Sequence, residues 1–296
     1  MMSQLQRRNG LSKEDSDYLR QLQKGFEGEV SFDKKLEGLN DDYLILHDLQ
    51  LEVNRQTFQI DTLVLSETGI VVYEVKNYQG EYIFAEKEFR SYPYNSVILN
   101  PQIQLSRAIT LLKILMQTLK IESELSAKVV FVNPTFVLYN CPPDSDVLMP
   151  QQIGHHISQM NKQSRPVKSA QKKLAKKFLS LHKTDERFMK LPAYSFKELN
   201  KQVTCLECQS ILTKRSRRKS TCLQCGFHEL NAHIIKYEIE SVRLLFPELK
   251  LTTSLIYDWC GAYFSDDSIE RVLKKYFVQI GSNKGRYYIK DTPLED

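Results

Sequence analysis

Four polar residues lie in or directly after two apolar runs that are typical of buried β-strands. The runs, Phe58–Leu65 and Ile70–Val75, flank a short turn, and the polar residues are Gln59, Asp61, Glu74 and Lys76. Side chains two positions apart on a strand point the same way, so Gln59 and Asp61 share a face, as do Glu74 and Lys76. A hairpin register that joins these faces gathers two carboxylates and one ammonium at the end of a buried sheet.

Such a group of charges suits a divalent metal ion. Two crowded carboxylates repel, and Mg²⁺ relieves the repulsion by binding carboxylate oxygens while it keeps several waters. The metal lowers the pKa of a bound water and stabilises charge on a phosphoryl oxygen, and a nearby lysine can orient the attacking water. The pattern therefore indicates phosphodiester hydrolysis. A buried ion pair of Lys76 with Asp61 or Glu74 is the alternative, since an unpartnered buried charge costs several kcal/mol.

A wider set of motifs extends from Gly25 to Cys141, which is less than half of the chain. The motifs are Gly25-Phe26-Glu27-Gly28-Glu29, Gln59-Ile60-Asp61, Gly69-Ile70, Glu74-Val75-Lys76-Asn77-Tyr78-Gln79-Gly80 and Asn100-Pro101-Gln102-Ile103-Gln104. In this order they resemble the nuclease-related domain (NERD) family, which is grouped with the PD-(D/E)xK nucleases. One departure is Phe89, which stands where the family often has a tryptophan, and it leaves the expected fold unchanged.

The resemblance implies a role for each residue of the polar group. Asp61 and Glu74 would bind Mg²⁺ or Mn²⁺, and Lys76 would be the catalytic lysine. Glu29 would add an acidic group from the preceding helix, and Gln59 would be an accessory residue of the site. The alternative to catalysis is a fold of this family that is kept only for binding nucleic acid.

The segments around these residues predict an α/β fold, a PD-(D/E)xK-like mixed sheet flanked by helices. Helical spacing covers Gly25–Leu39, which carries Glu29, and Ile103–Leu119, while Leu11–Leu22 is a polar helix or an arm. Gln104, near a helix start, either faces the site or lies on the helix surface. Further strands are predicted at Tyr43–Leu51, Glu81–Ala85, Lys128–Val132 and Phe136–Tyr139.

Two Cys-x-x-Cys pairs predict a second metal site. Cys205 and Cys208 are followed, after thirteen residues, by Cys222 and Cys225. Four thiolates in this arrangement bind Zn²⁺ tetrahedrally, and because such a site is closed its role is structural. The pairs resemble a zinc ribbon, and a redox dithiol is the alternative. The remaining cysteines, Cys141 and Cys260, are predicted to be buried thiols.

The last segment predicts a small winged-helix-like domain. Helical segments at His233–Phe246, Thr252–Trp259 and Asp266–Tyr276 precede a hairpin at residues 277–290. The last of these helices could enter the major groove of DNA. The expected contacts are Arg271, Lys274 and Lys275, with Lys284 and Arg286 on the hairpin. A protein-docking role or a plain helical cap is the alternative.

The basic residues are concentrated in the middle of the chain. Residues 162–220 carry 17 Lys and Arg against 4 Asp and Glu, whereas residues 1–161 carry 15 against 21. A polyanion such as nucleic acid suits this block, and a solvated helix with a linker is the alternative. The helix Val167–Leu181 either ends the nuclease-like domain or tethers it. The expected phosphate contacts in this block are Lys172, Lys173, Lys176, Lys177, Arg215, Arg217 and Arg218.

Length and composition complete the expectations. The 296 residues suffice for two or three domains, and we expect an arm or helix (1–24), a nuclease-like domain (25–160), a basic helix and linker (161–200), a zinc ribbon (201–230) and a winged-helix-like domain (231–296). The sequence has no apolar run that would cross a membrane and no signal-peptide core, so we expect a cytoplasmic protein. The predicted function is a metal-dependent nuclease acting on DNA, and the alternative is a non-catalytic nucleic-acid-binding or regulatory protein.

Overall fold

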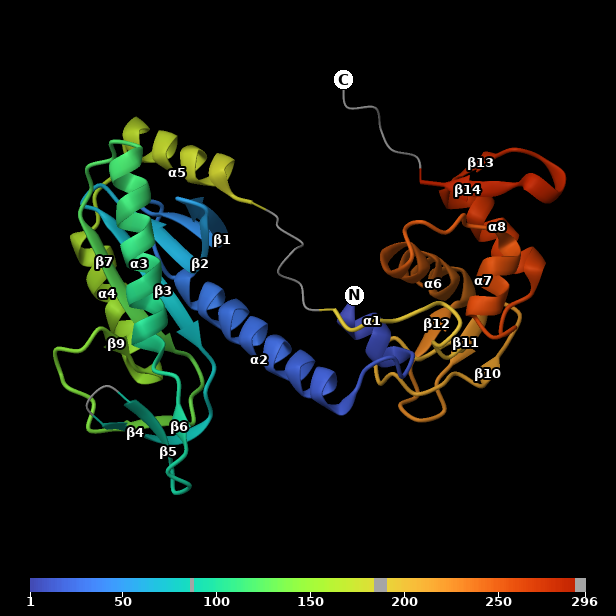
Figure 1. Ribbon diagram of the computed structural model, residues 1–296, viewed down its shortest axis with the longest axis horizontal. Helices are drawn as coiled ribbons and strands as arrows, with labels where there is room; N and C mark the ends of the chain where they lie inside the picture. Colours follow the sequence, from blue (N-terminus) through green and yellow to red (C-terminus); the bar gives the residue numbers. More distant parts are fainter. Residues whose placement is uncertain (86–87, 184–190, 291–296) are drawn as a thin grey trace. The chain divides into compact units, whose positions relative to one another are not determined.

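The computed structural model describes residues 1–85, 88–183 and 191–290, and the side chain of Lys284 also lies outside this description. Contacts divide the chain into two compact units (Figure 1). Unit 1 contains Met1–Leu19 and Met189–Asp296, and unit 2 contains Arg20–Phe188. Unit 2 is therefore an insertion, in sequence, between the two parts of unit 1.

The centre of unit 2 is a five-stranded mixed sheet. Its strands, in spatial order, are β1 (Leu44–Val53), β2 (Gln56–Leu65), β3 (Ile70–Lys76), β7 (Leu125–Phe131) and β9 (Val147–Leu148). Neighbouring pairs β1–β2 and β2–β3 are antiparallel, whereas β3–β7 and β7–β9 are parallel. The strands that carry the polar group are thus in the middle of the sheet, where their apolar runs place them.

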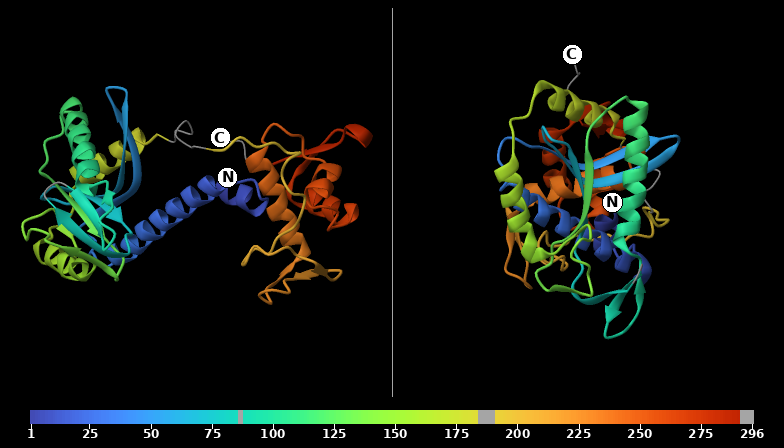
Figure 2. Two further views of the ribbon diagram at one scale, coloured as in Figure 1. Left: turned by 60° about the horizontal axis from the view of Figure 1, so that its bottom comes forward. Right: turned by 90° about the vertical axis from the view of Figure 1, so that its left-hand side faces the viewer.

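Helices cover both faces of this sheet. The helices are α2 (Lys13–Leu36), α3 (Pro101–Thr118), α4 (Ile153–Gln163) and α5 (Ser169–Leu181), with a 3₁₀ turn at Pro150–Gln152. Leu112 of α3 and Phe178 of α5 share one buried cluster with the sheet, and Phe32 of α2 and Ile157 of α4 share another. Figure 2 shows α3 in green against the strands. This arrangement confirms the predicted class of a mixed sheet flanked by helices.

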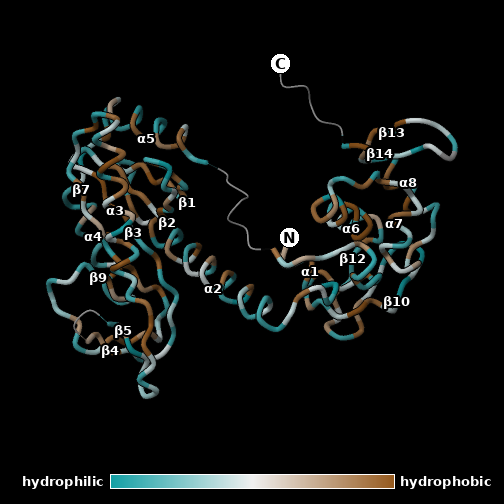
Figure 3. The backbone as a smooth tube through the Cα atoms, viewed as in Figure 1, coloured by the Kyte–Doolittle hydropathy of each residue, from teal (hydrophilic) through white to brown (hydrophobic). Residues whose placement is uncertain are grey.

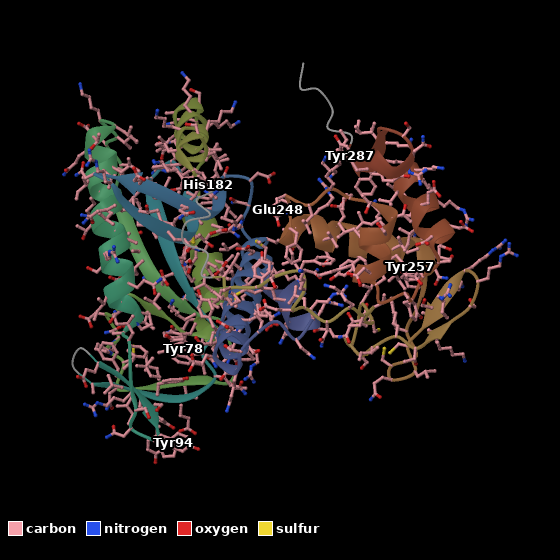
Figure 4. All side chains as sticks on the ribbon, turned by 45° about the vertical axis from the view of Figure 1, so that its right-hand side comes forward. Tyr78, Tyr94, His182, Glu248, Tyr257 and Tyr287 are labelled. Carbon is pink, nitrogen blue, oxygen red and sulfur yellow. The ribbon has the colours of Figure 1, made fainter. Side chains whose placement is uncertain are left out.

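A smaller sheet adjoins the central one. Its strands, in spatial order, are β6 (Val97–Ile98), β5 (Glu88–Tyr92), β4 (Gly80–Ala85) and β8 (Phe136–Tyr139). Stacked rings join the two sheets: Phe131 lies 3.8 Å from Phe136 and 5.9 Å from Phe89, which is fully buried. Phe89 is therefore part of the interior where the two sheets meet. Figure 4 labels Tyr78, which precedes β4, and Tyr94, which lies in the turn between β5 and β6.

Unit 1 combines a small ribbon with a helical bundle. The ribbon contains β10 (Lys214–Arg215), β11 (Lys219–Thr221) and β12 (His228–Leu230), paired antiparallel. The bundle contains α1 (Met2–Arg7), α6 (Asn231–Leu245), α7 (Thr253–Trp259) and α8 (Asp266–Tyr276), followed by the hairpin of β13 (Val278–Ile280) and β14 (Tyr287–Ile289) and its 3₁₀ turn Asn283–Gly285. One buried cluster includes Leu5 from α1, Cys222 from the ribbon and Trp259 from α7.

The first residues, expected as an arm or helix, are part of the interior of unit 1. Arg8 is 3% exposed, and its guanidinium forms an ion pair with Glu238, donates to the carbonyl oxygen of Trp259 at 2.8 Å and stacks over the Trp259 ring at 3.9 Å. Trp259 Nε1 donates to the same Glu238 carboxylate at 3.0 Å. A buried charge pair with these additional hydrogen bonds fixes α1 against the bundle.

Two elements differ from the sequence prediction. The segments Leu11–Leu22 and Gly25–Leu39 merge into the single helix α2, which continues through Gly25. A glycine there costs only about 1 kcal/mol, which the packed end of the helix outweighs. The strand predicted at Glu81–Ala85 forms, but it belongs to the smaller sheet.

Figure 3 shows that apolar residues gather in the central sheet of unit 2 and in the helices that cover it.

The helices also bear on membrane insertion. Among the residues that the structure describes, no helix is both long enough and apolar enough to span a bilayer.

Arg8 generates a prediction about the stability of unit 1. In Arg8→Met the Glu238 carboxylate stays buried without its cation, so unit 1 should lose about 3–5 kcal/mol of unfolding free energy. Trp259 is the single tryptophan of the chain, so its fluorescence in a urea titration reports unit 1 alone. Arg243→Met, which removes a more exposed pair with Glu240, is the matched control and should cost no more than about 1 kcal/mol.

A second variant separates charge from packing. Adding Glu238→Gln to Arg8→Met removes the stranded charge and should restore part of the lost stability. Equal losses in Arg8→Met and Arg243→Met would contradict the role given to Arg8.

Candidate active site

The candidate site forms where β2 leaves β3. The two strands pair from Thr62 to Leu65, and the next register position would bring Asp61 opposite Glu74. There the backbone N–H of Val75 donates to Oδ2 of Asp61 at 2.8 Å. The Asp61 carboxylate thus takes the place of the main-chain acceptor that a continuing β2 would offer to the Val75 N–H. This hydrogen bond fixes the carboxylate where the two strands diverge.

Lys76 links the strand to a helix. Its Nζ donates to Oε1 of Glu74 at 2.6 Å and to Oε1 of Gln104 at 3.1 Å. Gln104 is in the first turn of α3, where Pro101 occupies the first helical position and the Asn100 side chain caps the helix. The structure thereby directs Gln104 toward the site, one of the two alternatives that the sequence left open. An ammonium has three donors, so one remains for a water or a phosphate oxygen.

A further acidic residue, Asp48, was not found from the sequence. The register of β1 and β2 on either side places it opposite Asp61, and Gln59 Nε2 donates to its Oδ1 at 2.9 Å. Its backbone is left-handed, with φ of 47°. The signal in the sequence is an aspartate inside the apolar segment Tyr43–Leu51, but only the register shows that it faces Asp61.

The charges at the site are unbalanced toward the negative. The pKa of Glu29 is raised to about 7, first by burial and then by the charges of Asp61, Asp48 and Asp33, against the opposing effect of Lys76. The pKa of Glu74 also rises to about 7, first through burial and then through Asp61, against the opposing effect of Lys76.

Burial and neighbouring charges also shift the pKa values of Asp61 and Lys76. Burial raises the pKa of Asp61 despite the hydrogen bond from Val75 and the charge of Lys76. Burial lowers the pKa of Lys76, but the carboxylates of Glu74 and Asp61 outweigh this and raise it overall. Lys76 is therefore cationic, and one cation serves several carboxyl groups.

This donor set fits a divalent metal ion. The available ligands are carboxylate oxygens, which Mg²⁺ and Mn²⁺ prefer, and a cation there would lower the pKa values that crowding raises. Within the described residues, three of these acidic groups do not converge to within 4.8 Å of one another. The fit is accordingly to a site with one or two carboxylates and several waters, as is usual for Mg²⁺.

The four cysteines of the ribbon converge as a separate site. Their Sγ atoms all lie within 4.8 Å of one another, with Cys205–Cys225 at 3.7 Å and Cys208–Cys222 at 3.5 Å. Tetrahedral zinc with Zn–S bonds of about 2.3 Å requires S–S separations of roughly 3.8 Å. The cluster could therefore hold a structural metal such as zinc, in agreement with a zinc-ribbon-like unit.

The other two cysteines differ from each other. Cys260 is buried, as predicted, whereas the prediction for Cys141 is wrong, because it is only half-buried. Cys141 comes two residues after Tyr139, the last residue of β8, and its Sγ lies 3.1 Å from the Ser145 hydroxyl.

The predicted nucleic-acid contacts lie on both units. On α5, Lys172, Lys173, Lys176 and Lys177 are exposed, while Ala175 and Phe178 of the same helix are buried in the core of unit 2. The helix is thus a packed part of unit 2, and its lysines form a solvated basic face.

The predicted contacts of unit 1 have different surroundings. Arg215 lies over the ring of Tyr263, and Lys275 lies over the ring of Tyr276. Lys274 and Arg286 both form ion pairs with Glu270, at 2.8 and 2.7 Å. Of the other predicted contacts, Arg217, Arg218 and Arg271 line one surface hollow, and the side chain of Lys284 lies outside the described residues.

Comparison with known proteins gives one family match, over part of the chain. Residues 24–137 match the family model described as the nuclease-related domain, NERD. Searches of curated proteins and of solved structures each found no significant match. The matched segment contains the candidate site residues Glu29, Gln59, Asp61, Glu74, Lys76 and Gln104, and it ends before the four-cysteine ribbon.

The raised pKa values generate a prediction about pH. Because the Glu74 pKa is about 7 in the folded protein and lower when unfolded, its protonated form stabilises metal-free unit 2. That stabilisation is present at acid pH and is lost as the pH rises through about 7. Metal-free unit 2 should therefore unfold at a lower urea concentration at pH 8 than at pH 6, as followed by circular dichroism with Trp259 fluorescence separating unit 1.

The control is Glu74→Gln, which cannot ionise and should lose the part of this dependence that Glu74 contributes, while the part from Glu29, whose pKa is also about 7, remains. Added Mg²⁺ should stabilise the wild type more at pH 8 than at pH 6, since it binds the ionised carboxylates. A pH dependence that is the same in Glu74→Gln and in the wild type would contradict the assignment.

Proposed function

Because residues 24–137 match the nuclease-related domain family, we propose that unit 2 is a metal-dependent nuclease that hydrolyses phosphodiester bonds, with DNA as its substrate. The observation that carries the proposal is the local geometry: the Asp61 carboxylate is fixed by the Val75 N–H, beside a Glu74–Lys76–Gln104 chain. A binding module has no need to retain an expensive cluster of buried acids, whereas a metal site requires them.

The proposed roles follow from the contacts. Asp61 and Glu74 would hold Mg²⁺ or Mn²⁺, which would activate a water and stabilise charge on the phosphoryl oxygens. Lys76, held by Glu74 and Gln104, directs its remaining N–H toward the attacking water or the phosphate. Pre-positioned donors of this kind stabilise developing charge without reorganisation.

Glu29, Asp48 and Gln59 would influence the protonation of the site. Glu29, with a pKa of about 7, can hold or release a proton near neutral pH. Gln59 binds Asp48, and the Asp48 charge in turn raises the pKa of both Asp61 and Glu29.

We also propose that unit 1 engages nucleic acid and that its four cysteines hold one structural Zn²⁺. The support is the S–S spacing of the cluster and the basic side chains on the ribbon and on α8. The basic face of α5 would add phosphate contacts from unit 2.

The first test is cleavage by variants that keep the fold. Asp61→Asn retains an acceptor for the Val75 N–H but loses the negative charge, so Mg²⁺-dependent cleavage should fall by more than about 100-fold, as expected for several kcal/mol of metal stabilisation. Glu74→Gln should have a similar effect. Lys76→Met should reduce cleavage strongly while Mg²⁺ affinity, measured by calorimetry, changes less.

A matched control lies on the same hairpin. Glu52→Gln removes an acidic residue of β1 that pairs with Lys183 away from the site and should cleave at the wild-type rate. Wild-type rates in Asp61→Asn would refute the assignment. Absence of cleavage in every protein, with nucleic-acid binding intact, would favour the non-catalytic alternative.

The zinc proposal predicts about one Zn²⁺ per chain in elemental analysis. Cys222→Ser should lose the metal, and unit 1 should become less stable because structural zinc contributes directly to folding. Trp259 fluorescence should therefore show earlier unfolding of unit 1. Cys141→Ser is the control and should retain the zinc, and a metal-free wild-type protein would overturn the proposal.

A further inference from the structure

A hollow of about 210 Å³ lies in unit 1 where three elements meet. The ribbon turn contributes Arg217 and Arg218, the start of α6 contributes Asn231, and α8 contributes Ser268 and Arg271. Its floor is apolar, with side chains from β12, α6 and α8. Residues separated by about fifty positions in the sequence thus line one concave surface.

The hollow carries three positive charges. All three arginines are exposed, and among the ion pairs of the described residues none involves Arg217, Arg218 or Arg271. Three guanidiniums around one small space repel one another until an anion is bound.

The acidic residues close in sequence to those of the hollow either contact other groups or lie in the first turn of a helix. Glu229 accepts from the backbone N–H of Leu230 and lies 3.1 Å from His233 Nδ1, and Glu270 pairs with Lys274 and Arg286. Asp266 and Asp267 occupy the first turn of α8, where a negative charge is favourable.

The arginine-bearing turn is held in place by Asn231. The Asn231 backbone N–H donates to the carbonyl oxygen of Arg218 at 2.9 Å, and its side chain donates to that of Ser216 at 3.1 Å. The buried Ser220 hydroxyl donates to Asn231 Oδ1 at 2.8 Å, and Ser216 closes the turn through Lys219. A turn with these bonds loses little conformational entropy on binding, so it is pre-organised for its ligand.

We propose that this hollow is a binding site for a single backbone phosphate of a nucleic acid strand, shared by Arg217, Arg218 and Arg271. Guanidinium forks match phosphate oxygens in geometry and in charge, and the apolar floor suits the adjoining sugar. The inference rests on the proposed engagement of nucleic acid by unit 1 and states how that engagement occurs.

A phosphate shared by three arginines predicts a different salt dependence of affinity from three separate phosphate contacts. If each arginine met its own phosphate, neutralising all three would flatten the log–log dependence of affinity on salt by nearly three units for duplex DNA. A single shared phosphate gives a change of only about one unit. Arg215, which lies over Tyr263, is outside this hollow and should contribute independently.

The experiment uses the full-length protein and a fluorescent DNA duplex without added Mg²⁺, across a series of KCl concentrations. Arg217→Gln, Arg218→Gln and Arg271→Gln are measured singly and as the triple variant. Each single variant should weaken binding roughly ten-fold at low salt, as expected for a lost charge-assisted hydrogen bond. The triple variant should lose less than the sum of the single losses and flatten the slope by about one unit.

Arg243→Gln is the control, an arginine of unit 1 that pairs with Glu240 away from the hollow. Trp259 fluorescence and zinc content verify that each variant is folded. Additive losses with a slope change near three units would overturn the shared site, as would variants indistinguishable from Arg243→Gln. Cleavage in the presence of Mg²⁺ is assayed in parallel, so failure of the arginine site is distinguished from failure of the nuclease proposal.

Discussion

One hydrogen bond organises the candidate site: the Val75 N–H donates to the Asp61 carboxylate where β2 and β3 separate. If the strands stayed paired, the sheet backbone would satisfy this donor and Asp61 would have no fixed position. Their divergence leaves the Val75 N–H without a main-chain partner on β2, next to Glu74 and Lys76. The paired part of the sheet therefore provides rigidity, and the end of the pairing allows a carboxylate to take the place of a main-chain acceptor.

The acidic excess at this opening has opposite effects on folding and on function. Burial and mutual repulsion raise the pKa values of Glu29, Asp61 and Glu74, so their ionised forms are unfavourable in the metal-free protein. Lys76 offsets only part of this cost. Sites that need cations commonly carry such instability, and the packed clusters on both faces of the sheet compensate for it.

The sequence predicted those features that arise from local patterns. Strand alternation placed Glu74 and Lys76 on one face, and the cysteine spacing anticipated the sulfur cluster. What it missed depends on distant contacts: Asp48 opposite Asp61 requires the β1–β2 register, and the buried position of Arg8 requires Glu238 and Trp259. The grouping of Arg217 and Arg218 with Arg271 likewise arises only when the ribbon packs beside α8. The continuous α2 was missed because packing outweighs the low helix propensity of Gly25.

The discontinuity of unit 1 has a consequence for biosynthesis. Arg8 leaves the ribosome 230 residues before its partner Glu238. At synthesis rates of about 5–20 residues per second, the interval is roughly 10–50 s. Unit 2, which is continuous in sequence, is complete during that interval, whereas the first nineteen residues must wait beside the nascent chain with a charged side chain and apolar Leu5 exposed to solvent. Unit 1 therefore assembles only after unit 2 has been synthesised. Until α6 and α7 emerge, Met1–Leu19 has no folded partner within unit 1 and is accessible to chaperones and proteases.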